Sequence, residues 1–417
     1  MEPKAILETV VAEHAEEAAF LWLQRTRAVH APNYAPAQFA DLDERLEAHI
    51  DGLRVAGDEG RRIAGESIGS GEPEDVFAPA VLAIEASDDG FVDLLARSEE
   101  TPAVAPGLIS ALGWVEPTFL TGRVKALLVA PTPFQQMLGV AACGVHRKDP
   151  GAVLLSYLTS PAATVRSRAL RSAGELGRTD LLPQVLAAVG DAKKDAQFWA
   201  ARSGVLLGNR GKALDGLISL ALTPGARRLA SLRLSLQAMD VDGSHELLLR
   251  LAETPDAERL RVIGAGVSGS ARYVPWLIDR MLDPLLARVA GEALVNITGA
   301  DFNLDQLEAM PPEGFEDGPT EDAADENVEV PEDAALPWPD VPRVKAWWAK
   351  NAARFAGGTR YFLGLPVSIG SCRAVLTTGF QRQRVAAAHV LSLLEPGTPL
   401  FNTSAPAWRQ HSRESSG

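Results

Sequence analysis

Residues 164–191, TVRSRALRSAGELGRTDLLPQVLAAVGD, decide the fold. Their apolar side chains recur at helical spacing in two successive stripes: Val165, Ala169, Leu170, Ala173 and Leu176, then Leu182, Val185, Leu186 and Val189. Such stripes are typical of short amphipathic helices. Gly177 is expected to cap the first helix, because a left-handed cap favours a residue without a Cβ atom. Asp180 is the expected N-cap of the second helix.

The same helical pair recurs about seven times between residues 104 and 299. The expected ends of the first helices are spaced 30 to 33 residues apart: Gly113, Gly144, Gly177, Gly208, Met239, Gly269 and Gly299. A pair this short cannot bury its apolar stripes alone, whereas stacked pairs can. Small residues such as Ala169 and Ala230 are expected to let neighbouring helices approach closely. The repeat therefore predicts an all-α solenoid, a superhelix of helix pairs.

Three arginines occupy the same position in successive repeats. Arg171, Arg202 and Arg233 each lie six residues before the marker of their repeat. Two interpretations stay open. The arginines can form a ladder that bonds adjacent turns of the stack, or they can form a basic strip that binds an acidic partner.

Two segments of the repeats resemble a known class of helical repeat. VRSRALRSAGELG, residues 165–177, and LARVAGEALVNITG, residues 286–299, are similar to HEAT-type repeats, in the bacterial version also found in phycobilin lyases. The resemblance implies a right-handed, HEAT-like α-solenoid over the repeat region. It implies little about function, because such scaffolds serve many roles.

The composition excludes several classes of protein. The chain has 417 residues, is 46% hydrophobic and carries a net charge of −14, which argues against general binding to nucleic acids or anionic membranes. With only Cys143 and Cys372, a disulfide framework is not expected and a reducing compartment fits. The start of the chain does not resemble a signal peptide, and no apolar run reaches the ~18 residues of a membrane span. We therefore expect a cytoplasmic, bacterial-type protein without membrane insertion.

Changes in composition predict four segments: an N-terminal helical cap, 1–100; HEAT-like repeats, 101–300; an acidic flexible loop, 301–340; and a C-terminal helical cap and tail, 341–417. In the first segment we expect a helix over residues 4–30, a second helix capped by Asp41, and two shorter helices between residues 74 and 97. Three histidines occur there without metal-ligand spacing, so they predict no metal site: His14, His30 and His49. The last segment is expected to hold one more helix and a loop that folds back, with disorder after Arg409.

The acidic loop has an unusual composition. Residues 311–334 contain ten acidic and no basic residues, so neither helix nor strand is expected and the loop should be mobile. Three roles stay open: a solvated insertion, an electrostatic lure for a basic partner, or weak binding of divalent cations. The candidate partner-binding residues within it are Glu321, Asp322, Asp325 and Glu326.

Tryptophans gather after the acidic loop. Trp338, Trp347 and Trp348 lie close together in the sequence and near basic residues. They either cap the far end of the array or form a hot spot for a partner, because Trp and Arg are enriched in such spots. The pattern that begins at Thr298 and ends at Phe302 is expected to meet the tryptophans in space, with the acidic stretch inserted between them.

Three short motifs are expected to be coincidental. Residues 264–269 satisfy G-x-G-x-x-G and residues 65–69 satisfy G-x-S-x-G, but neither follows a predicted strand, as a dinucleotide site or a nucleophile elbow at Ser67 requires. Cys143 and His146 lack the second pair that a zinc site needs. The sequence therefore predicts no catalytic residue, no metal and no cofactor.

Over nearly its full length the chain resembles a family of bacterial HEAT-repeat proteins whose genes are often associated with type VI secretion clusters. The most specific part of the likeness is the C-terminal QRQRVAAAHVLSLLEPGTPLFNTSAPAWRQ, residues 381–410. That family has no established activity, so the resemblance implies a context. The function we expect is a non-enzymatic protein-binding scaffold, adaptor or chaperone for a secretion effector or component. The alternatives are an immunity protein that neutralises a toxin and a lyase-like enzyme related to phycobilin lyases.

Overall fold

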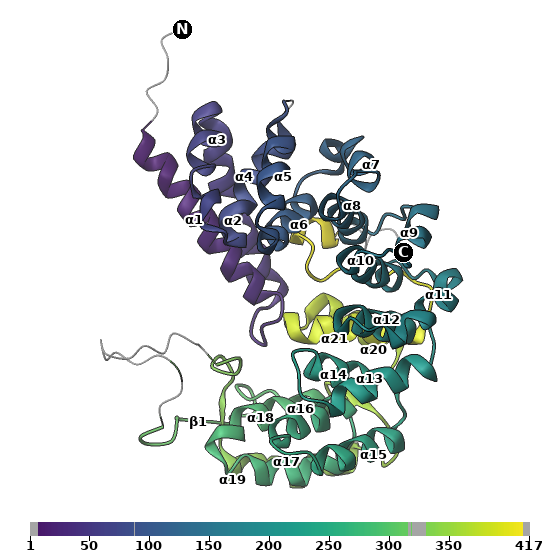
Figure 1. Ribbon diagram of the computed structural model, residues 1–417. Helices are drawn as coiled ribbons and strands as arrows, with labels where there is room; N and C mark the ends of the chain where they lie inside the picture. Colours follow the sequence, from purple (N-terminus) through teal and green to yellow (C-terminus); the bar gives the residue numbers. More distant parts are fainter. Residues whose placement is uncertain (1–6, 87, 316–317, 319–330, 412–417) are drawn as a thin grey trace. The chain divides into compact units, whose positions relative to one another are not determined.

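The computed structural model describes residues 7–86, 88–315, 318 and 331–411 (Figure 1). These residues form 22 α-helices and four strands of two residues each. The predicted all-α class is confirmed. None of the described helices combines the length and the apolar character that crossing a membrane requires. The chain forms two compact units: unit 1, Met1–Leu207, Thr378–Ala388 and Pro396–Gly417, and unit 2, Gly208–Thr377 and His389–Glu395.

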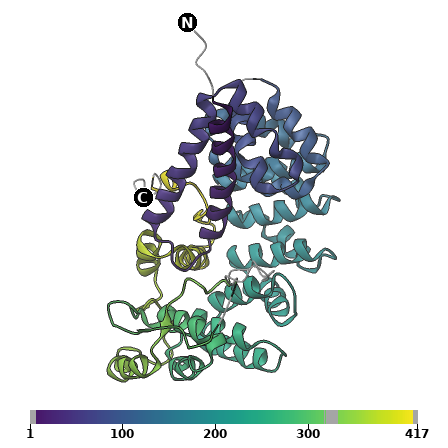
Figure 2. The ribbon, with the colours of Figure 1, turned by 90° about the vertical axis from the view of Figure 1, so that its left-hand side faces the viewer.

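Unit 1 contains the first twelve helices and the last one: α1 (Glu8–Ala28), α2 (Pro36–Val55), α3 (Asp58–Ala64), α4 (Pro73–Glu85), α5 (Gly90–Glu99), α6 (Ala105–Trp114), α7 (Arg123–Leu128), α8 (Pro133–His146), α9 (Ala152–Tyr157), α10 (Ala163–Glu175), α11 (Leu182–Ala187), α12 (Lys194–Leu206) and α22 (Ala407–His411). The long helices α1 and α2 lie side by side (Figure 2). Helices α4, α6, α8, α10 and α12 pack in chain order, each against the next, as stacked repeats require.

Unit 2 continues the same pattern with α13 (Lys212–Leu222), α14 (Arg228–Ala238), α15 (Val241–Ala252), α16 (Glu258–Ser268), α17 (Val274–Arg280), α18 (Pro284–Thr298), α19 (Val341–Asn351) and α20 (Ile369–Thr378). Helix α21 (Gln381–Leu394) contributes residues to both units, and the last residue of α20, Thr378, belongs to unit 1. Helices α14, α16 and α18 pack in series, and each is paired with a second helix. Two antiparallel ladders complete the unit: β1 (Glu308–Ala309) with β2 (Trp338–Pro339), and β3 (Tyr361–Phe362) with β4 (Leu365–Pro366).

Four of the seven expected helix ends carry the predicted left-handed glycine. The backbone angle φ is 68° at Gly177, 101° at Gly208, and 67° at both Gly269 and Gly299. Helix α14 ends at Ala238 and is followed by Met239 in an extended conformation. The expectation is wrong at Gly113 and Gly144, which lie inside α6 and α8.

Gly144 contributes to packing rather than to capping. A Cβ atom there would overlap the Arg168 guanidinium and approach Glu175 Oε2 to 2.8 Å, so glycine lets α8 lie close to the ion pair on α10 without displacing these side chains. Gly174 likewise faces Ser203, and Gly266 faces Ala293, where an added Cβ would lie 2.7 Å from the Ala293 Cα atom. At these positions the close approach is made by glycines, whereas Ala230, one of the alanines expected to allow it, is exposed.

Two predicted N-caps are wrong. Asp180 lies in a 3-10 turn, where its carboxylate pairs with Arg178 at 2.6 Å, and α11 begins after it without a side-chain cap. Asp41 lies inside α2, because that helix already begins at Pro36. Proline is well suited to the first helical position, since its fixed φ matches the helix and its missing N–H is not needed there.

In unit 2, residues 360–364 run across the C-terminal ends of α14, α16 and α18. Arg360 donates to the carbonyls of Gln237 at 2.8 Å and Ser268 at 3.1 Å, and also to that of Leu236. The backbone continues this role: Tyr361 N–H donates to the Gly269 carbonyl, Leu363 to Asn296 and Gly364 to Ile297. The last carbonyls of a helix have no partner within it, so this segment satisfies three helix ends in turn.

In unit 1, residues 397–411 do the same for α10, α8 and α6. The Leu400 N–H donates to the Glu175 carbonyl at 3.0 Å, and Asn402 Nδ2 donates to the Val145 carbonyl at 2.9 Å. Arg409 then donates to three carbonyls at the end of α6, those of Gly113, Trp114 and Val115. The predicted return of the tail is confirmed. Gln410 is only 4% exposed, so the predicted disorder is wrong for that residue; residues 412–417 lie outside the described residues.

Candidate functional site

Arg171 and Arg202, both in unit 1, flank one tryptophan. The guanidinium carbon of Arg171 lies 4.7 Å from the Trp199 ring centroid, and that of Arg202 lies 5.4 Å from it. Arg171 Nε also bonds Glu175 Oε1 at 2.7 Å. Burial lowers the pKa of Arg202 to about 10, which leaves it charged at neutral pH. Arg233 lies on α14 of unit 2. A role of these arginines in partner binding stays a prediction.

Glu175 is the centre of a buried charge cluster. Its carboxylate accepts hydrogen bonds from Arg168 at 2.8 Å and from Arg171, and it lies 3.8 Å from Arg147. Burial alone would raise the pKa of Glu175, but the three guanidinium groups outweigh it and hold the pKa well below its ordinary value. Arg147 directly follows α8, whereas Arg168, Arg171 and Glu175 lie on α10. The cluster therefore joins these two helices and has a structural role in the stack.

The two ends of the acidic segment are fastened at one place in unit 2. Asp333, 4% exposed, pairs with Arg259 at 3.0 Å and with Arg288 at 3.5 Å. The Arg288 guanidinium lies 5.0 Å from the Trp338 ring centroid, and Phe315 packs edge-on against the same ring at 5.0 Å. We call these five residues the clasp.

The β1–β2 ladder closes the chain just outside the clasp. Ala309 pairs with Trp338 and Glu308 with Pro339, and the Asp340 N–H donates to the Leu307 carbonyl at 2.7 Å. Phe315 and Asp333, on the two sides of the acidic segment, therefore lie at one place in unit 2, close to Trp338 and Arg288. Glu321, Asp322, Asp325 and Glu326 lie outside the described residues, and so does most of the predicted mobile loop.

The remaining tryptophan candidates pack against the core of unit 2. Trp347 and Trp348 are half-buried beside Val344, in the same apolar cluster as Phe302 and Ile297. The expected meeting of the two halves of the pattern is confirmed. Trp348 also packs against Phe355, with ring centroids 5.5 Å apart.

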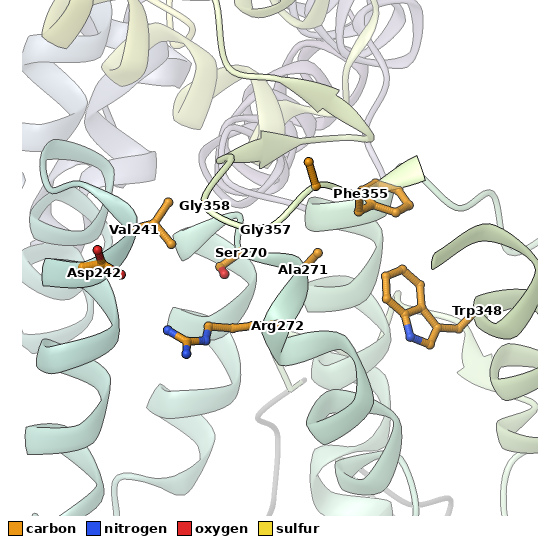
Figure 3. Close-up of a pocket in the computed structure, with 10 residues that line it drawn as sticks. Val241, Asp242, Ser270, Ala271, Arg272, Trp348, Phe355, Gly357 and Gly358 are labelled. Carbon is orange, nitrogen blue, oxygen red and sulfur yellow. The ribbon is translucent and has the colours of Figure 1, made fainter. Parts of the chain in front are cut away.

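Trp348 and Phe355 form one end of a pocket of about 480 Å³ in unit 2 (Figure 3). At the other end lie Asp242, in the first turn of α15, and Arg272, in the turn after α16, with Ser270 between the two ends. The pocket joins segments more than a hundred residues apart in the chain, so no local sequence pattern could have found it.

The coincidental motifs lie where the sequence predicts. Residues 264–269 belong to α16 and its cap, where Gly264 and Gly266 face Leu248 and Ala293, so no strand precedes them. Residues 65–69 follow α3 and enter a 3-10 turn, again without a preceding strand.

Cys143 and His146 are both buried. Burial raises the pKa of the Cys143 thiol to about 11, and His146 Nε2 contacts the Leu112 carbonyl at 2.7 Å. His14 and His49, two of the three histidines of the N-terminal segment, meet across α1 and α2 with their Nδ1 atoms 3.1 Å apart. Within the described residues, no group of three or more His, Cys, Asp or Glu side chains could hold a metal ion.

No protein-family model matches the chain, and no curated protein matches it.

Proposed function

We propose that the protein is a non-enzymatic scaffold that binds another protein, as an adaptor or chaperone, and presents its acidic segment to a basic surface of that partner. The observation that carries the proposal is the clasp. A solvated insertion needs no fastening, yet here a buried carboxylate, two arginines and two aromatic rings hold both ends of the segment together.

Fastening both ends favours binding for a physical reason. A segment with fixed ends samples fewer conformations than a free tail, so less entropy is lost when a partner orders it. The ten acidic residues of the segment supply a long-range field that accelerates encounter with a basic surface and that salt screens. From the family resemblance we propose a cytoplasmic partner, either a type VI secretion effector or a component of the secretion apparatus.

The first test removes charge from the segment. A variant with Glu321→Gln, Asp322→Asn, Asp325→Asn and Glu326→Gln should recover less partner when tagged protein is isolated from native cells and the captured proteins are identified by mass spectrometry. With four charges removed, the association rate at low salt should fall by about tenfold and its salt dependence should weaken.

The matched control removes the same number of charges from unit 1, at exposed positions: Glu13→Gln, Glu16→Gln, Asp41→Asn and Glu44→Gln. Equal partner recovery by both variants would show that the acidic segment is not the binding element. Capture of no specific partner by the wild-type protein would count against a binding function altogether.

The second test opens the clasp without changing the acidic segment beyond it. Replacing Arg288 by Met removes one of the two partners of Asp333 and the cation over Trp338. If presentation matters, this variant should bind the captured partner more weakly while unit 2 stays folded by circular dichroism. Unchanged affinity, measured by isothermal titration, would show that the clasp has a structural role and does not contribute to binding of the partner.

A gene deletion separates the adaptor from the immunity alternative. For an adaptor, the deletion should reduce secretion without harming the cell that lacks the gene. Self-intoxication that is cured by deleting a neighbouring toxin gene would replace the proposal with an immunity function.

A further inference from the structure

The pocket of unit 2 has walls fixed by contacts that do not involve its open space. Phe355 is 9% exposed and packs edge-on against Tyr361 at 5.0 Å, and the Tyr361 hydroxyl accepts the Ala356 N–H at 2.8 Å. Between the two ends of the pocket, Ser270 is buried and forms a backbone bridge with Arg360. The hollow is therefore preformed, and its volume of about 480 Å³ lies within the usual range of small-ligand sites.

The two ends of the pocket differ in chemistry. Figure 3 shows Asp242 and Arg272 on one side and the Trp348 and Phe355 rings on the other. Asp242 and Arg272 are both exposed, and neither forms an ion pair or a side-chain hydrogen bond with another described residue. One end thus offers one anion and one cation that are available to a ligand, and the other end offers an apolar surface.

The edge of the pocket between its aromatic and polar ends is backbone. Gly357 and Gly358 line it, and a Cβ atom on either would meet nothing within 4 Å. Gly358 has φ of 76°, a conformation that glycine adopts without strain. A ligand backbone can therefore approach the chain closely at this edge.

We propose that this pocket binds an α-amino-acid unit with an apolar side chain. Its carboxylate pairs with Arg272, its nitrogen donates to Asp242, and its side chain lies against Trp348 and Phe355. One cation and one anion at the polar end favour a group that carries both kinds of partner, rather than a phosphate, which would meet the repulsion of Asp242. Such a unit is either a free amino acid or the C-terminal residue of a peptide. The assignment does not depend on the acidic segment.

Isothermal titration of the purified full chain tests the assignment with three probes: L-phenylalanine, N-acetylglycyl-L-phenylalanine, and the C-terminal amide of that dipeptide. Both free acids should bind, and the amide should bind at least about tenfold more weakly because it loses the charged bond to Arg272. Arg272→Gln should weaken both acids by about the same factor and leave the weak amide binding unchanged.

Asp242→Asn distinguishes the two sources. A free amino acid places an ammonium group at Asp242, so this variant should weaken L-phenylalanine by about tenfold and the acetylated dipeptide much less. Tighter binding of the dipeptide acid assigns the site to a peptide C-terminus, and tighter binding of L-phenylalanine assigns it to the free amino acid. Arg373→Gln, whose side chain is exposed, is the matched control and should change neither affinity.

The assignment is overturned if neither acid binds at about 5 mM, since a site of this size should then show measurable heat. It is also overturned if the amide binds as well as the acid, or if Arg272→Gln has no effect. Because the probes are small molecules and the protein is alone, failure here leaves the proposal of an acidic, partner-binding segment untouched.

Discussion

A Glu175→Gln variant should lose about 3–5 kcal/mol of stability in unit 1, the cost of breaking a buried ion pair from one side. Glu175 is 4% exposed and shares its carboxylate with Arg168, Arg171 and Arg147. Glutamine keeps the shape but removes the negative charge that these three cations share. Hydrogen exchange of the α8 and α10 amides, followed in increasing denaturant, measures the loss where it occurs.

The pH dependence of the stability difference between the wild type and the Glu175→Gln variant tests whether the Glu175 charge causes that difference. Because the guanidinium groups lower the pKa of Glu175, the folded protein holds this proton less tightly than the unfolded chain. Its stabilisation is therefore complete above the unfolded value of 4.5 and is lost as the pH falls through the lower folded-state pKa. The advantage of the wild type over the variant should stay constant from about pH 7 to about pH 5 and shrink below that.

Asp180→Asn is the matched control for this prediction. Its carboxylate also pairs with an arginine, Arg178, but its side chain is 60% exposed. Exposed pairs contribute at most about 1 kcal/mol. If the two variants unfold at the same denaturant concentration, burial is not what makes the Glu175 cluster stabilising.

Replacing Arg360 by Met should destabilise unit 2 by about 3 kcal/mol or more, since each unsatisfied buried acceptor costs about 1–3 kcal/mol. Arg360 donates to the ends of two helices, through Gln237 and Leu236 on α14 and Ser268 on α16. Burial lowers its pKa to about 10, so the group stays charged and fully protonated at neutral pH. Protection of the α14 and α16 amides against hydrogen exchange should fall together.

Two further variants separate shape from charge. Arg360→Lys keeps the charge but lacks the planar fork that reaches several carbonyls, so it should restore less than half of the lost stability. Arg373→Met, at a position 68% exposed, should change stability by less than about 0.5 kcal/mol. Full rescue by lysine would show that charge near the helix ends, rather than directed hydrogen bonds, stabilises unit 2.

The repeat itself is predictable because its information is local. Within residues 164–191 the apolar stripes and Gly177 predict α10 and its end, since helical periodicity needs only neighbours three and four positions away. The same reasoning fails at Gly144. Its role depends on Arg168 and Glu175 in the next repeat. The sequence alone does not distinguish a glycine inside a helix from a glycine that ends one.

The sites were less accessible to prediction because they join distant segments. The sequence indicates Trp338 as a partner-binding candidate, but its contact Arg288 lies fifty residues earlier in the chain. Asp333, which also pairs with Arg288, cannot be distinguished in the sequence from its acidic neighbours. Among the residues that line the pocket, the sequence indicates Trp348 as a partner-binding candidate but not Arg272 or Asp242, because nothing in their own repeats distinguishes these two from other surface charges.

The hydrogen bonds of residues 397–411 determine when unit 1 can complete its fold during biosynthesis. The carbonyl of Glu175 receives its hydrogen bond from Leu400, which the ribosome adds 225 residues later. At ordinary translation rates that interval lasts roughly 10 to 45 s. Throughout it, the ends of α6, α8 and α10 are open to water, chaperones or other nascent chains, so unit 1 reaches its final form only after nearly the whole polypeptide has been made.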